Sequence, residues 1–164
     1  MLYTLILYGF QQQIRFNTDH DFNNPIGSRW FNECLLSKFI TFARCSKAKS
    51  VEYLNVSFDR LEDQITPDTF VYADPPYRST LGVYNDGKRG FEGWTIEHEQ
   101  RLCAFLDLIH QHGAQFMLSY VLQVEGFYNE EVANWAERNN YHIIDIEIPQ
   151  GRYNNRREVL IINY

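Results

Sequence analysis

Three stretches of the chain carry apolar residues at the three- and four-residue spacing of an amphipathic helix. The first runs from Trp30 to Ala43. The second follows the capping residue Thr95 and ends at Gly113, and the third follows the capping residue Asn129. Their apolar stripes are Phe31, Leu35, Phe39 and Phe42; Leu102, Phe105, Leu106 and Ile109; and Val132, Trp135 and Ala136. The pattern predicts three helices, each with one face toward a core.

Alternating or short apolar runs predict strands between and after these helices. The runs are residues 51–58, 70–74, 114–119, 141–148 and 158–164. Residues 51–58 (VEYLNVSF) alternate, whereas residues 70–74 (FVYAD) are expected to form a brief buried strand. Strands that alternate with helices and then close with a strand pair are typical of an α/β sheet.

The N-terminal region has a different pattern. The first ten residues, MLYTLILYGF, are apolar but lack a basic leader, a cleavage site and the length to span a bilayer, so we expect a buried helix. Residues 11–29 are polar and rich in Asn and Asp, and the extended IRFN and DFNNP segments around a polar tip predict a hairpin or ordered loop.

Length and charge narrow the picture only slightly. A chain of 164 residues suits one domain, and three widely spaced cysteines favour neither a disulfide framework nor a zinc site, which fits a reducing cytoplasm. The net charge of −6 divides into +2 over residues 1–60, −10 over 61–147 and +2 over 148–164. An acidic body with mildly basic ends can still contact phosphates locally.

The segment VYADPPY (71–77) places a carboxylate directly after an apolar strand, where ligands of open α/β sheets bind. One interpretation is a plain strand end, with two prolines stopping the ladder. The chemical interpretation explains each residue. Asp74 accepts one N–H of an aromatic amine, the fixed carbonyl of Pro75 accepts the other, and Tyr77 stacks on a base that has left its duplex.

These residues resemble the Dam-type adenine-specific DNA methyltransferases, over nearly the whole chain. Residues 8–27 resemble the family's target-recognition hairpin, including Arg15-Phe16-Asn17 and the Phe-Asn-x-Pro-x-Gly step that ends at Gly27. VYADPPY matches the catalytic motif, FMLS the next core strand and RREVLIINY the closing strand.

The resemblance implies a fold, a reaction and a set of site residues. The fold is an incomplete Rossmann-like methyltransferase sheet with helices on its faces and an N-terminal recognition hairpin. Residues 1–45 would form a partial target-recognition region and residues 46–164 the C-terminal portion of the catalytic domain. A methyl group would pass from S-adenosylmethionine to the exocyclic amine of a flipped adenine in double-stranded DNA, with no metal. The implied catalytic residues are Asp74, Pro75, Pro76 and Tyr77, and Asp74 also belongs to the donor site.

DNA contacts are expected from two regions. Arg15 suits bidentate reading of guanine, unless it pairs with Asp19 or Asp21 instead. The other expected contacts are Asn17, Asn23, Pro25 and Arg29 in the N-terminal region and Arg152, Arg156 and Arg157 near the C-terminus. The C-terminal arginines fit a solvated hairpin tip equally well.

Two departures from the family matter. Tyr120 stands where relatives usually have asparagine, so the resemblance does not carry a role over to that position. The glycine-rich strand-turn-helix that binds the donor is missing, and Gly87, Gly90 and Gly93 follow no strand and do not replace it. We therefore expect weak donor binding, and a donor-binding partner chain or a homodimer.

The resemblance implies that the first two strands of the family's sheet are missing from this sequence. In the family's usual strand order these two strands lie between the strands that match residues 51–58 and FVYAD. FVYAD should therefore lie at an exposed sheet edge beside bare apolar surface, and either recruit a second chain or pair with residues 51–58.

Two rival functions remain open at this point. One is a non-enzymatic DNA-recognition subunit or inactive remnant, which the missing glycine motif favours. The other is a methyltransferase acting on RNA or a protein amide, which ranks lower because such enzymes usually carry asparagine at the position of Asp74.

Overall fold

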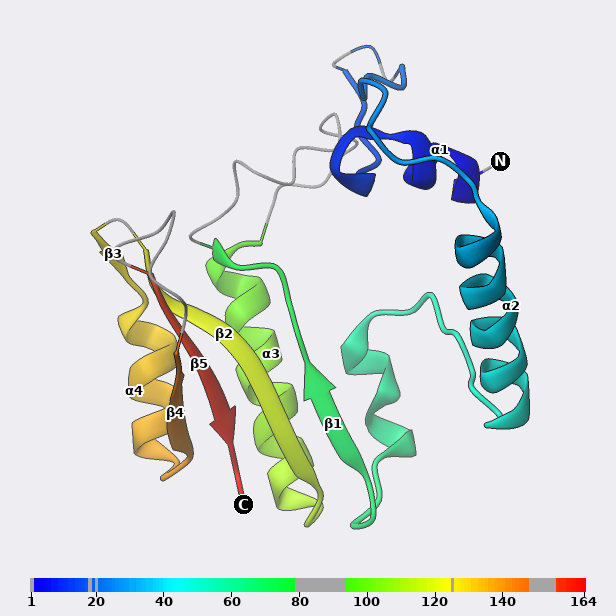
Figure 1. Cartoon of the computed structure of the whole chain (residues 1–164). Helices are drawn as coiled ribbons and strands as arrows, with labels where there is room; N and C mark the ends of the chain where they lie inside the picture. Colours follow the sequence, from blue (N-terminus) through cyan, green and yellow to red (C-terminus); the bar gives the residue numbers. More distant parts are fainter. Residues whose placement is uncertain (1, 18, 20, 79–93, 125, 148–155) are drawn as a thin grey trace. The chain divides into compact units, whose positions relative to one another are not determined.

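The computed structural model describes residues 2–17, 19, 21–78, 94–124, 126–147 and 156–164 (Figure 1). The described residues fall into two units, one formed by residues up to Asn55 and the other by Val56 onward. The second unit contains the sheet and the Asp-Pro-Pro-Tyr segment.

The described strands form one mixed sheet of five strands in the order β1-β2-β5-β4, with β3 paired to β2. Their bounds are β1 Phe70–Ala73, β2 Gln115–Val124, β3 Phe127–Tyr128, β4 His142–Ile146 and β5 Arg157–Ile162. β1 and β2 are parallel, whereas β5 runs antiparallel to both β2 and β4. The predicted α/β architecture and the closing strand pair are confirmed.

Two helices cover one face of this sheet, α3 (Ile96–Gln111) and α4 (Glu130–Arg138). Both begin at the predicted caps, because the side chains of Thr95 and Asn129 accept hydrogen bonds from backbone N–H groups of the first turn. All seven apolar stripe residues predicted for these helices are buried. They pack against alternate residues of β2, namely Phe116, Leu118, Tyr120 and Leu122.

A short helix, η2 (Phe58–Gln64), packs beside α3 through a ring contact between Phe58 and Phe105, whose centroids are 5.5 Å apart.

The opposite face of the sheet is apolar, and it is exposed at the two edge strands β1 and β4. In the register of the sheet, Tyr72, Met117, Ile162 and Leu160 share this face with Ile144. Tyr72 is 58% exposed and Ile144 is also exposed. The expectation of helices on the faces of the sheet is met on one face, where α3 and α4 lie, and the described residues of this unit place no α-helix on the other. The expectation of bare apolar surface is confirmed.

β1 is an edge strand, as predicted, because its one partner among the described strands is β2. It is less buried than expected, since Phe70 and Tyr72 are both about half exposed. The strand predicted at 51–58 is wrong. Residues 51–57 have no strand assignment, Phe58 begins η2, and the side chains of Val51, Tyr53, Leu54 and Val56 are exposed. Alternation alone does not make a strand where no neighbouring backbone pairs with it.

The first unit contains α1 (Leu2–Tyr8), the short η1 (Phe10–Gln12) and α2 (Glu33–Ala48). α1 is helical as predicted, but of its described side chains Leu7 alone is buried. α2 begins three residues later than the predicted segment, because the Asn32 side chain caps its N-terminus, and it ends five residues later. No residue of α2 is buried, and Phe39 and Phe42 of its apolar stripe are exposed.

No helix in the described part of the chain has both the length and the apolar character needed to cross a membrane.

Candidate active site

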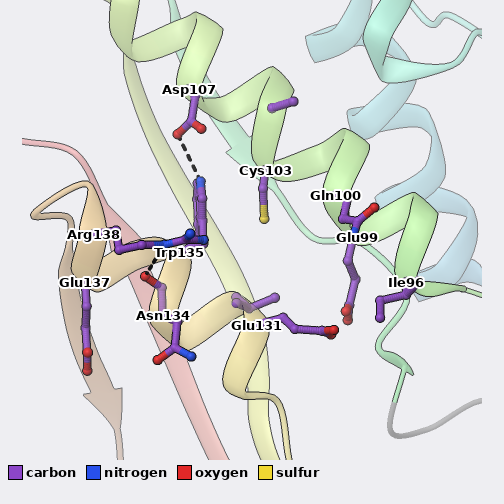
Figure 2. Close-up of a pocket in the computed structure, with 12 residues that line it drawn as sticks. Ile96, Glu99, Gln100, Cys103, Asp107, Glu131, Asn134, Trp135, Glu137 and Arg138 are labelled. Atoms are coloured by element: carbon purple, nitrogen blue, oxygen red, sulfur yellow. Dashed lines mark hydrogen bonds between the residues drawn. The ribbon is translucent and has the colours of Figure 1, made fainter.

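A groove of about 690 Å³ lies between α3 and α4, on the helical layer of the second unit. Figure 2 shows Cys103 and Trp135 facing into it, with the Trp135 indole donating a hydrogen bond to Asp107 (3.0 Å). Burial raises the pKa of the Cys103 thiol to about 12, which leaves it protonated and unreactive. None of residues 74–77 lines this groove, so the predicted chemistry lies elsewhere.

The Asp-Pro-Pro-Tyr segment leaves the carboxyl end of β1. Ala73 pairs with Leu118, so Asp74 follows β1 beside the position of Ser119 on the parallel strand β2. Asp74 and Pro76 are exposed, while Pro75 and Tyr77 are half-buried. The sequence prediction that the carboxylate stands at the ligand-binding edge of the sheet is supported by this placement.

Asp74 and Tyr77 are in direct contact. The Tyr77 hydroxyl donates a hydrogen bond to Asp74 Oδ1 over 2.8 Å. Burial, followed by this bond, raises the pKa of Tyr77 to about 12, whereas a hydrogen bond with Ser119 acts in the opposite direction. The Tyr77 ring also meets the edge of the Tyr120 ring, with centroids 5.6 Å apart. The segment therefore holds an exposed carboxylate next to an anchored aromatic ring.

A buried polar network lies behind Tyr77, and sequence reasoning missed it. Glu99 of α3 is 3% exposed. Its Oε1 accepts a hydrogen bond from the Tyr120 hydroxyl and another from Asn129 Nδ2 (2.8 Å). Burial raises the pKa of Glu99, while its bond with Tyr120 and the charge of Arg78 lower it. The one sequence signal was Tyr120 itself, the departure from the family's usual asparagine.

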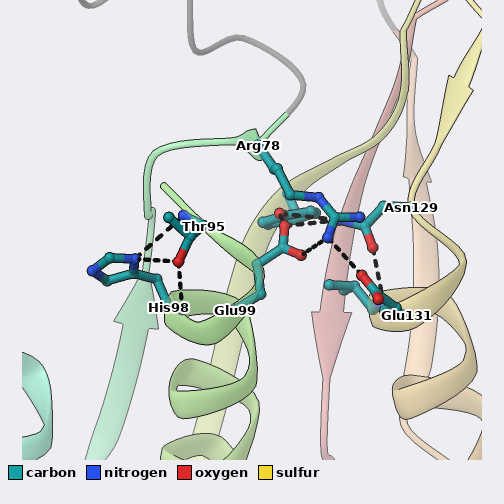
Figure 3. Close-up of polar contacts among 8 residues, drawn as sticks. Arg78, Thr95, His98, Glu99, Asn129 and Glu131 are labelled. Carbon is teal, nitrogen blue, oxygen red and sulfur yellow. Dashed lines mark hydrogen bonds and ion pairs between the residues drawn. The ribbon is translucent and has the colours of Figure 1, made fainter. Parts of the chain in front are cut away.

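Arg78 joins this network directly after the motif (Figure 3). Its Nη1 lies 3.4 Å from Glu99 Oε2 and 2.7 Å from Glu131 Oε2. Its guanidinium carbon lies 5.3 Å from the centroid of the Phe127 ring. The residue that follows Tyr77 is thus attached to both helices and to β3.

The N-terminal hairpin predicted for residues 11–29 is present in the first unit. Phe16 and Phe22 form an antiparallel bridge, and the Asn23 N–H donates to the Arg15 carbonyl (2.8 Å). Asn17 shapes the tip, because its side-chain oxygen accepts hydrogen bonds from the backbone of Asp19 (3.0 Å) and Asp21 (2.8 Å).

Arg15 is exposed, and no carboxylate of the described residues forms an ion pair with it. Asn23, Pro25 and Arg29 are also exposed.

The base of the hairpin is close-packed in a way that the sequence did not indicate. The Gly27 N–H donates to the Tyr8 carbonyl (2.7 Å), and a Cβ at Gly27 would lie 2.7 Å from the Gly9 carbonyl oxygen. Asn24 Nδ2 donates to the Gln13 carbonyl (2.7 Å). Glycine is therefore required at position 27 for α1 to approach the hairpin.

A comparison with protein families assigns this arrangement. Residues 1–148 match the family of D12 class N6 adenine-specific DNA methyltransferases. The chain belongs to this family. The match includes both the hairpin and the Asp-Pro-Pro-Tyr segment, which bears out the resemblance seen in the sequence.

Three curated proteins are similar to this chain over 99% of the length of this chain. They are the type II methyltransferase M.FokI of Planomicrobium okeanokoites (37% identical), the modification methylase LlaI of Lactococcus lactis subsp. lactis (38%) and the modification methylase StsI of Streptococcus sanguinis (34%). The chain spans 26% of the length of each.

Two of the three C-terminal arginines, Arg156 and Arg157, form ion pairs within the protein. Arg157 on β5 forms a bidentate contact with Asp145 on β4, in which Nε donates to Oδ1 (2.6 Å) and Nη2 donates to Oδ2 (3.2 Å). This contact lowers the pKa of Asp145. Arg156 pairs with Glu158. Arg152 lies outside the described residues. Intramolecular pairing favours the structural role for Arg156 and Arg157, and their DNA contacts stay a prediction.

The described residues do not form a glycine-rich site for the methyl donor. The turn that follows β1 is Asp-Pro-Pro-Tyr, and Gly126 lies in the tight turn between β2 and β3 with a φ of +85°. Gly87, Gly90 and Gly93 lie outside the described residues. Asp74 is the one described residue that the sequence assigns to the site of the methyl donor.

Proposed function

We propose that this chain is the catalytic and target-recognition portion of an adenine-specific DNA methyltransferase that acts on double-stranded DNA within a restriction-modification system. The observation that carries the proposal is the exposed Asp74 carboxylate, hydrogen-bonded to Tyr77 at the carboxyl end of β1. Membership of the D12 family and the names of the methylase relatives agree with it.

The four residues 74–77 have separate roles in the proposed reaction. The exocyclic amine of adenine is a poor nucleophile because its lone pair is delocalised into the ring. Asp74 Oδ1 already accepts from Tyr77, which fixes the carboxylate while its other oxygen accepts one amine N–H. The Pro75 carbonyl accepts the second N–H, so that the lone pair turns out of the ring plane. Pro76 restricts the backbone that aims this carbonyl.

Tyr77 would hold the base. A base outside its duplex is stabilised by stacking on an aromatic face. Contacts with Asp74, Ser119 and Tyr120 restrict the ring before any ligand arrives, so less rotamer freedom is lost on binding. S-adenosylmethionine would supply the methyl group, and among the described residues Asp74 is the one expected to contact it.

Arg15 would select the target sequence. A guanidinium reads guanine by two parallel hydrogen bonds in the major groove. Arg15 is exposed on a hairpin whose backbone is fixed by the bridge at Phe16 and by the Asn17 turn. Asn23, Pro25 and Arg29 would contact DNA around it.

A second candidate function is DNA recognition without chemistry, as a subunit or remnant. The observation in its favour is that, among the described residues, Asp74 is the one predicted contact to the methyl donor and no glycine-rich turn accompanies it. In that case Arg15 would act as proposed, while Asp74 and Tyr77 would have no reaction to support.

Enrichment from a random duplex library separates the two candidates. The purified chain should enrich one short sequence that contains adenine. With 2-aminopurine at that adenine, the wild-type chain should raise the fluorescence and Tyr77→Ala should not, because an extruded base needs its stacking partner. Enrichment without a fluorescence rise would favour recognition alone, and no enrichment would contradict both functions.

A further inference from the structure

Glu99 is a buried carboxylate whose three partners come from three separate segments. It lies in the first turns of α3, and its contacts are Tyr120 on β2, Asn129 at the cap of α4 and Arg78 beyond the motif. A buried charge is costly unless it is paired and hydrogen-bonded, and an apolar residue would fill such a position at lower cost. The network therefore calls for an explanation other than packing.

The network meets the catalytic segment at two places. Arg78 immediately follows Tyr77, and its side chain is held by Glu99 and Glu131 (Figure 3). Tyr120, which donates to Glu99, also packs its ring against Tyr77. β1 fixes the N-terminal end of residues 74–77. The contacts of Arg78 and the packing of Tyr120 against Tyr77 fix the C-terminal end.

We propose that Arg78, held by the buried carboxylate of Glu99, is a positioning residue that sets the direction of the Asp74 carboxylate and the Pro75 carbonyl. It touches no reacting atom. The proposal rests on the proposed function of residues 74–77. Two fixed ends restrict a four-residue segment with two prolines to a narrow range of conformations, which is the geometry that amine activation requires.

The two acidic partners of Arg78 differ in what they contribute. Glu131 is exposed, so its pair with Arg78 should contribute little, whereas Glu99 is buried and its charge is screened much less. Losing Arg78 would leave Glu99 with its two neutral partners and no cation. The Glu99 contact is therefore expected to dominate.

Three variants and a control test the proposal. Arg78→Ala removes the anchor, Arg78→Lys keeps its charge, and Glu99→Gln keeps acceptors for Tyr120 and Asn129 while removing the charge. Arg101→Ala is the matched control, because it removes an exposed ion pair with Asp59 from α3 without touching the network.

Two measurements are made on each variant of the full chain. NMR amide exchange compares Asp74 and Tyr77 with the core probes Leu118 and Ile161, which are buried in β2 and β5. DNA affinity and 2-aminopurine fluorescence are measured on the enriched duplex.

In Arg78→Ala, exchange at Asp74 and Tyr77 should rise on the order of tenfold while the core probes stay unchanged. DNA affinity should stay within about twofold while the fluorescence rise falls on the order of tenfold, because binding and base placement use different residues. Arg78→Lys should recover part of both, Glu99→Gln should behave like Arg78→Ala with a smaller effect, and Arg101→Ala should behave like the wild type.

Unchanged exchange at Asp74 and Tyr77 in Arg78→Ala would overturn the proposal, as would equal acceleration at the core probes, which indicates a general structural role. If the wild-type chain fails to bind or flip DNA, the proposed function fails, and the exchange comparison still decides whether Arg78 positions the segment.

Discussion

The carboxylate of Asp74 combines two properties. It is exposed to a ligand, yet one of its oxygens is already engaged by Tyr77, whose ring is held from behind by Tyr120. A carboxylate fixed in this way needs little reorganisation when an amine arrives. At the scale of single residues, the proposed chemistry therefore depends on Asp74 more than on the charge of the surrounding surface.

We predict that Asp74→Ala abolishes methyl transfer once the chain is complemented with a donor-binding partner. Loss of one preorganised polar contact at a reacting centre typically costs about a hundred- to a thousandfold in rate, and Asp74 is the principal contact here. DNA affinity should be largely unchanged. Single-turnover transfer of labelled methyl groups checks this. Asp68→Ala, an exposed carboxylate before β1, should keep full activity, and unchanged turnover in Asp74→Ala would remove it from the mechanism.

Arg15 gives a second prediction at this scale. Arg15→Ala should lower discrimination at one base pair by about 1–3 kcal/mol, because a bidentate contact with guanine is lost. Binding titrations with duplexes substituted at each position measure this. Arg44→Ala, an exposed arginine on α2, should leave the sequence preference unchanged. An equal loss of affinity on all duplexes would show that Arg15 contacts phosphate instead.

At the scale of elements, helices of equal length have very different environments. α3 and α2 each contain 16 residues and an apolar stripe. α3 buries its stripe against β2, whereas no residue of α2 is buried. The apolar pattern is the same, so burial depends on what each helix packs against.

This difference predicts unequal mutational costs. Leu106→Ala in α3 should lower the free energy of unfolding by about 2–5 kcal/mol, because Leu106 is 0% exposed and its removal leaves a cavity. Leu36→Ala in α2, where Leu36 is 40% exposed, is the matched control and should cost about 1 kcal/mol or less. Urea denaturation of both variants measures this, and equal costs would contradict the burial seen here.

Local signals explain which elements could be predicted from the sequence. α3 and α4 were predictable because Thr95 and Asn129 cap them and their stripes have a helical period. β1 and the hairpin were predictable from the proline and turn residues that bound them. Residues 51–58 were not, since a strand needs a partner that alternation does not reveal. The Glu99 network joins residues 21 and 30 positions apart, and no local pattern reports such contacts.

At the scale of the whole molecule, helices cover one face of the sheet, and the other face is exposed at its edge strands. α3 and α4 cover one face, and the described part of this unit places no helix on the other. β5 and β4 close the sheet beyond β2, while β1 is left at the opposite edge. The Asp-Pro-Pro-Tyr segment thus starts from an edge strand.

We predict that the chain alone binds S-adenosylmethionine very weakly. The described residues contribute Asp74 to the predicted donor site and no glycine-rich turn that would present backbone amides. Isothermal titration calorimetry with and without DNA measures this, and S-adenosylhomocysteine serves as a second ligand. A dissociation constant on the order of 1 μM for the lone chain would contradict the prediction and restore a self-sufficient enzyme.

The exposed edge of the sheet at β1 leads to a prediction about self-association of the chain. The outward backbone groups of β1 are unpaired among the described strands, and Tyr72 adds apolar surface beside them. Such an edge pairs readily with another chain. Residues 51–57, expected from the sequence as an alternative partner of β1, have no strand assignment. We therefore predict that the isolated chain self-associates through β1 or exchanges a segment with a second copy.

Sedimentation velocity over a range of concentrations tests this. The wild-type chain should show a mass above 19.5 kDa that grows with concentration. Tyr72→Lys should shift it toward the monomer, because a lysine at an edge disfavours strand pairing and removes apolar area from the bare face. Tyr53→Lys is the control, since Tyr53 is also aromatic and 68% exposed but lies outside the sheet. A wild-type chain that stays monomeric at every concentration would show that the β1 edge needs no partner.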